Sequence, residues 1–148
     1  MTKLRTQLIA LTLLAYMASI ASLALAHNTQ TVGEGENQYQ VTVGYVNEPP
    51  YTEQLNGLDL IIRTADDQPV KNLESSLSAE LVAPDGEATR ELPLRAQYGE
   101  PGYYTSDFIL TKPGAYTFRI SGFIGELEVD LEIPYDHEVE AASELRFP

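Results

Sequence analysis

Residues 38–46, QYQVTVGYV, decide the fold class of this chain. The residues at positions 39, 41, 43 and 45 are tyrosine or valine and fall on one face of an extended chain. The residues between them are polar or glycine and fall on the other face. This two-residue period, carried by β-branched and aromatic side chains, predicts a strand buried on one side. Pro49 and Pro50 end it, because proline supplies no backbone N–H to a sheet.

Similar patterns follow along the chain and are separated by turns rich in proline, glycine and aspartate. Further strands are predicted at residues 58–64, 77–83, 87–95, 103–109, 115–121 and 123–133. Pro93 indicates an edge position for the strand that contains it. At Gly125 the alternation slips by one residue, which predicts a β-bulge. Seven short strands without an amphipathic helix favour an all-β, immunoglobulin-like antiparallel β-sandwich over residues 38–133, with a closed barrel as the alternative.

Residues 1–26 have the three parts of a secretory signal peptide. A basic start with Lys3 and Arg5 precedes an apolar stretch, and Ala24 and Ala26 supply the small residues expected before a cleavage site. Cleavage after Ala26 is expected to leave His27 as the first residue of an exported protein. An uncleaved membrane anchor and a cut after Ala24 are the alternatives. The protein is therefore predicted to be periplasmic, extracellular or on the cell surface, with membrane attachment only if residues 1–26 stay in place.

Two polar segments flank the predicted sandwich. Residues 27–37, HNTQTVGEGEN, contain two glycines and are predicted to be a flexible lead-in. Residues 134–148 are acidic and are predicted to form a flexible tail with at most a short helical turn.

Composition restricts the possible functions. The chain has 148 residues with 22 acidic and 9 basic ones, and no cysteine. Without residues 1–26, seven basic residues face 22 acidic ones, and the formal charge is −15. Such a surface repels phosphate backbones and anionic membrane surfaces, so nucleic acid is not an expected partner. The absence of cysteine excludes disulfides, thiolate metal sites and thiol nucleophiles.

Two segments carry a resemblance to a known group of exported domains. The run VGYVNEPPYTEQLNGLDLII and the later run GYYTSDFILTKPGAYTFRISG resemble YtkA-like or FixH-like immunoglobulin-like domains. The resemblance covers about 80 residues, from Val43 to Gly122, and it implies a fold rather than an activity. A second likeness, to CopC-like copper-binding domains, rests on His27 and the pair Asp136-His137. In those domains the N-terminal histidine binds copper, whereas their aspartate and second histidine come from the domain body and not from a segment after the last strand.

The histidines are the candidate metal ligands. If His27 is the first residue, its amine and its ring nitrogen can chelate one ion. The α-amine has a reference pKa of about 7.7–8.0, so a metal readily displaces its proton near neutral pH. His137 would add a third nitrogen and Asp136 an oxygen. This donor set suits Cu(II). The alternative is that both histidines lie in solvated segments without a metal.

Other chemical sites find little support. The two histidines and the missing cysteine leave no nucleophile-and-base pair, and no phosphate-binding loop is present, so the protein is predicted not to be an enzyme. The pair Asp66-Asp67 and the acidic row at 126, 128, 130 and 132 are the remaining candidate ligands, for calcium. A row on one strand face cannot wrap an ion, so this row is interpreted as the solvated side of an outer strand.

Several tyrosines lie near predicted loops. Tyr45, Tyr51, Tyr98 and Tyr104, with Tyr103, could form an aromatic patch that binds a protein partner. The alternative places Tyr39, Tyr103 and Tyr116 in the core, with Tyr116 hydrogen-bonded across a corner between the sheets. Two hypotheses follow: a copper-binding or copper-delivering domain, and a structural or protein-interaction module of the cell envelope without a metal.

Overall fold

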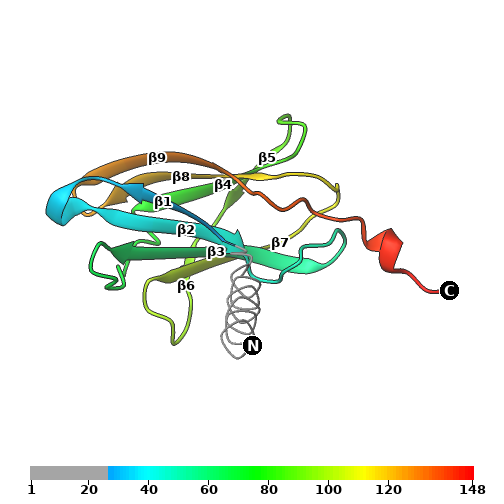
Figure 1. Ribbon diagram of the computed structural model, residues 1–148, viewed down its shortest axis with the longest axis horizontal. Coiled ribbons are helices and arrows are strands. Elements are labelled where there is room, and N and C mark those ends of the chain that lie inside the picture. The colour runs from blue at the N-terminus through cyan, green and yellow to red at the C-terminus, as the bar shows by residue number, and fades with distance from the viewer. Residues whose placement is uncertain (1–26) are drawn as a thin grey trace, which may run out of the picture.

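Two antiparallel sheets face each other in the computed structural model, which describes residues 27–148 (Figure 1). The five-stranded sheet has the order β1 (Asn28–Val32), β2 (Tyr39–Tyr45), β3 (Leu55–Thr64), β7 (Tyr103–Ile109) and β6 (Arg95–Ala96). The four-stranded sheet has the order β5 (Thr89–Leu92), β4 (Leu77–Val82), β8 (Thr117–Ile124) and β9 (Leu127–Pro134). The prediction of an all-β sandwich is confirmed, and two separate sheets replace the alternative of a closed barrel.

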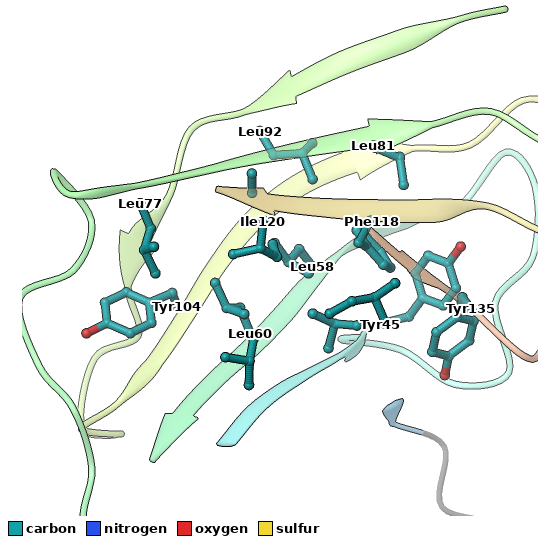
Figure 2. Close-up of a cluster of buried hydrophobic side chains, with 14 of the residues drawn as sticks. Tyr45, Leu58, Leu60, Leu77, Leu81, Leu92, Tyr104, Phe118, Ile120 and Tyr135 are labelled. Atoms are coloured by element: carbon teal, nitrogen blue, oxygen red, sulfur yellow. The ribbon is translucent and has the colours of Figure 1, made fainter. Parts of the chain in front are cut away.

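The core lies between the sheets and follows the alternation in the sequence. Val41, Val43 and Tyr45 on β2 are buried, as are Leu58 and Leu60 on β3. The four-stranded sheet contributes a matching set, and Figure 2 shows these side chains meeting in one layer: Leu77, Leu81, Leu92, Phe118 and Ile120. Burying such side chains stabilises the fold by about 1.5–3 kcal/mol each.

The lead-in was predicted wrongly. Residues 28–32 form β1, which pairs with β2 from Asn28 opposite Val43 to Val32 opposite Tyr39. Only residues 35–37 of the predicted lead-in lie in a short 3₁₀ turn, η1 (Gly35–Asn37). His27 therefore directly precedes an ordered edge strand.

The C-terminal segment also differs from the prediction, because much of it packs on the sandwich. Tyr135 and Val139 are buried. Gly114 and Val139 exchange two backbone hydrogen bonds of 2.9 Å, and Glu140 donates to the carbonyl of Pro50. The chain then forms a second 3₁₀ turn, η2 (Ala142–Leu145). The segment packs there because Tyr135 and Val139 complete the apolar layer at one end of the sandwich.

Two strand boundaries were also predicted wrongly. Gly125 is not a bulge but, with Glu126, forms the tight hairpin that joins Ile124 of β8 to Leu127 of β9. Gly125 has φ of +62°, a conformation that glycine adopts without steric cost. The predicted strand 87–95 is divided at Pro93, since β5 pairs with β4 whereas β6 pairs with β7 of the other sheet. Both pieces lie at sheet edges, as Pro93 indicated.

Two tyrosine hydroxyls fix loops to the sandwich. Tyr104 donates to the carbonyl of Val70 at 2.6 Å and accepts from the amide of Leu73 at 3.2 Å, which holds the crossover before β4. Tyr116 donates back to the carbonyl of Lys112 at 2.9 Å.

Within residues 27–148, no helix is long and apolar enough to cross a membrane.

Candidate functional site

His27, Gly44 and Asp59 lie side by side across three neighbouring strands. Asn28 is the register partner of Val43, and Gly44 is the partner of Asp59. Val43, Leu58 and Leu60 point inward, so Gly44 and Asp59 point to the outer face of the five-stranded sheet. We call these three residues the His27 row.

The ring of His27 lies directly over Gly44. Its Nε2 atom is 3.1 Å from Oδ2 of Asp59, and the two side chains are 29% and 19% exposed. A Cβ atom at position 44 would lie 2.3 Å from Cδ2 of His27 and 2.6 Å from its Nε2. No side chain other than hydrogen therefore fits beneath this ring, and Gly44 is required for the observed position of His27.

The contact with Asp59 determines which ring nitrogen of His27 is left for another ligand. A carboxylate accepts a hydrogen bond from the Nε2–H of the ring, and a neutral imidazole then carries its lone pair on Nδ1. Nδ1 is also the nitrogen that forms a chelate with the amine of the same residue when that amine is free. Carboxylates commonly hold metal-binding histidines in this way. When Nε2 carries the hydrogen, the contact therefore leaves Nδ1 as the ring nitrogen with an available lone pair.

Asp136 and His137 lie on the segment that follows β9. The side-chain amide of Asn28 donates to the carbonyl of Pro134 at 2.7 Å, which ties the start of β1 to the beginning of this segment. Both predicted residues are exposed, and the His137 ring is 5.9 Å from that of Tyr135. Within residues 27–148, no three histidine, aspartate or glutamate side chains are placed to hold one metal ion. The segments are joined at one edge, but the predicted ligands do not form a complete site.

The predicted aromatic patch is not formed as expected. Tyr45 and Tyr104 are each only 1% exposed and belong to the core, so neither can contact a partner at the surface. The alternation places both on inward faces of their strands, which the loop-based prediction overlooked. Tyr98 is fully exposed in the loop after β6, and Tyr51 is partly buried beside Glu140. These two tyrosines do not combine with the buried pair into one surface.

Tyr45 and Tyr135 instead form a buried aromatic cluster with Phe118. The Tyr45 ring centroid is 4.6 Å from that of Tyr135 and 5.5 Å from that of Phe118 (Figure 2). Burial raises the pKa of Tyr45, with smaller contributions from Tyr116 and Glu48. Burial also raises the pKa of Tyr135, whose hydroxyl donates to the Glu48 carboxylate. Within residues 27–148 the hydroxyl of Tyr45 has no hydrogen-bond partner.

The loops after β2 and β7 meet the C-terminal segment at one end of the sandwich (Figure 1). Residues of these three segments line a groove. Its volume is about 600 Å³. The lining combines prolines and small apolar residues with four glutamates and one histidine: Glu48, Pro49, Pro50, Pro113, Gly114, His137, Glu138, Val139, Glu140, Ala141 and Glu144. We call it the end groove.

The acidic row of the last strand lies on the outer face of the four-stranded sheet. Glu128, Asp130 and Glu132 are exposed, and Glu132 is 3.8 Å from Arg119 of β8. The carboxylates follow one strand face, as the sequence pattern indicated.

Sequence reasoning identified His27 but missed its two neighbours. A glycine inside a strand is a signal for close approach of another group, and Gly44 gave that signal. Asp59 gave none, because an outward aspartate on a strand is indistinguishable from a solvated one.

No protein-family model matches the chain, and no curated protein is significantly similar to it in sequence.

Proposed function

We propose that the protein is an exported, non-enzymatic domain of immunoglobulin-like type that binds Cu(II) through His27. In this proposal residues 1–26 are a signal peptide that is removed after Ala26, so that the α-amine of His27 is free. The observation that supports it best is the His27 row, in which Asp59 holds Nε2 and leaves Nδ1 for the chelate.

The donor set suits copper. An amine and an imidazole nitrogen on one residue form a chelate, and Cu(II) leads the divalent metals in affinity for such nitrogen ligands. The edge of the sheet leaves the ring 29% exposed, so an ion has access to it. His137 and Asp136 are the proposed further donors, because Asn28 fastens the segment that carries them near the start of β1.

The test begins with the full precursor. The exported protein is purified, its N-terminal residue is identified, and Cu(II) is titrated by calorimetry. We expect His27 at the terminus, tight binding of one ion, and loss of that binding in His27→Ala. Asp59→Asn is expected to bind Cu(II) about 10- to 100-fold more weakly, the usual cost of losing the group that supports a metal-bound histidine.

Two further measurements define the site. His137→Ala weakens binding only if His137 is a ligand, so an unchanged affinity removes it and leaves the chelate of His27. Circular dichroism of each variant shows that the sandwich is intact. A terminus other than His27, or equal affinity of the wild type and His27→Ala, would reject copper binding at this residue.

A second candidate function is a protein-interaction module of the cell envelope. The end groove favours it, because it is a concave surface of about 600 Å³ whose lining combines apolar residues with glutamates. The partner surface would then be this groove and not the tyrosine patch, since Tyr45 and Tyr104 are buried.

A further inference from the structure

The walls of the end groove are fastened to the body of the sandwich. Glu140 donates its amide to the carbonyl of Pro50, and Thr52 donates its amide to the carbonyl of Glu140 at 2.9 Å. The amide of Ala142 donates to the hydroxyl of Thr52 at 3.1 Å. An ion pair between Arg146 and Glu53 adds a further contact between the C-terminal segment and the loop after β2. Hydrogen bonds between the C-terminal segment and the loop after β2 therefore hold the concave shape of the groove.

The floor of the groove is apolar and its rim is acidic. Pro49 and Pro113 are exposed and present apolar surface, whereas Pro50 and Val139 are buried. Glu138, Glu140 and Glu144 are exposed along the rim. No lysine or arginine lines the groove, and among residues 27–148 none forms an ion pair with these three glutamates. The surface is thus complementary to an occupant with positive charges and a narrow apolar body.

The arrangement of the carboxylates distinguishes between kinds of cation. In the part of the chain that the structure describes, no three acidic or histidine side chains converge on a point as a metal ion requires. Charges spread along a groove instead match charges spread along an extended chain. Prolines on the floor add rigid apolar surface on which a peptide backbone can lie.

We propose that the end groove binds a short extended segment of a partner protein that carries several lysines or arginines. The apolar floor accepts the backbone and small side chains of that segment, and the glutamates on the rim accept its cationic groups. Peptide binding here rests on the second candidate function above and does not require copper binding at His27.

The test uses fluorescence anisotropy with a labelled peptide in which lysine and proline alternate. Proline keeps the probe extended and lowers the entropy cost of binding. The protein is exported from its full precursor. Replacing the three rim glutamates together, Glu138→Gln, Glu140→Gln and Glu144→Gln, is expected to weaken binding about tenfold, since each exposed charge pair contributes a modest amount.

A matched control changes the same number of charges elsewhere. The triple variant Glu126→Gln, Glu128→Gln and Asp130→Asn alters exposed residues in the β8–β9 turn and in β9, and we expect its affinity to fall by no more than about twofold. A peptide with glutamate in place of lysine should not bind. His27→Ala should bind the lysine peptide as the wild type does, so failure of copper binding and failure of peptide binding are distinguishable.

Several results would overturn the proposal. Equal losses in the two triple variants would mean that overall charge attracts the peptide. If spermine or Ca²⁺ displaces the peptide at a concentration below the Kd of the peptide, the groove is a site for small cations. Absence of any binding at low ionic strength would exclude a basic peptide as the occupant.

Discussion

Gly44 decides where the imidazole of His27 lies. Its φ is not positive, so the backbone accepts alanine, but the added methyl group would lie 2.3 Å from the His27 ring. We expect Gly44→Ala to retain the sandwich and to separate His27 from Asp59. Copper affinity should then fall about 10- to 100-fold, as for the loss of Asp59 itself.

A double-mutant cycle isolates this effect. The unfolding free energy of Gly44→Ala is measured with urea in the wild type and in His27→Ala. If the ring is the only obstacle, alanine at 44 should cost less stability once His27 is absent. Equal costs in both backgrounds would show that position 44 needs glycine for another reason.

Of the three residues in the His27 row, only His27 was predicted from the sequence. The small residues before His27 pointed to it, and its own chemistry made it the best ligand candidate. Its neighbours depend on the pairing of β1, β2 and β3, which brings together positions 27, 44 and 59. Such a juxtaposition follows from register, and register is not visible in a local pattern.

At the scale of elements, strands with an alternating apolar face were predictable, whereas the polar edge strand β1 was not. β2 and β3 alternate clearly because they bury one face. β1 turns Asn28, Gln30 and Val32 toward the interior, and only Val32 is apolar. Its pairing depends on backbone hydrogen bonds to β2 and on contacts such as that of Thr29 with Thr42 at 2.8 Å. A polar edge strand therefore has the composition of a loop.

The C-terminal segment stabilises the sandwich through Tyr135. This side chain is 3% exposed and packs against Tyr45 and Phe118. Tyr135→Ala should lower the unfolding free energy by about 3–5 kcal/mol, the cost of emptying a large aromatic site in a core. Urea unfolding followed by circular dichroism measures it.

Phe147 in the same segment is the matched control. It is 96% exposed, and Phe147→Ala should change stability by no more than about 0.5 kcal/mol. Similar small effects of both substitutions would show that residues 135–148 do not pack on the domain in solution.

At the scale of the whole molecule, buried tyrosines limit stability at alkaline pH. Burial raises the pKa of Tyr45, Tyr104, Tyr116 and Tyr135 above the usual value of 10.0. The unfolded chain loses these protons near pH 10, whereas the folded chain retains them. Their contribution to stability is therefore complete below about pH 10 and decreases as the pH rises above it.

The expected outcome is cooperative alkaline unfolding. The part of the tyrosinate absorbance that comes from these four buried tyrosines and the loss of circular dichroism should rise together above pH 10. Tyr45→Phe should move the transition to higher pH without a loss of stability at neutral pH, because it removes a buried hydroxyl that lacks a partner within residues 27–148. Complete ionisation of the tyrosines in a chain that stays folded would contradict this explanation.

The order of strands in the two sheets requires pairing between segments that are far apart in the sequence. Leu60 of β3 faces Tyr104 of β7, and Ala79 of β4 faces Ile120 of β8, so each pair joins segments more than forty positions apart. Closing loops of that length costs entropy before the contacts form, and sandwiches of this kind fold slowly. During synthesis, β3 and β4 therefore each keep one edge unpaired until β7 and β8 have been made, and such an edge can pair with another copy of the chain.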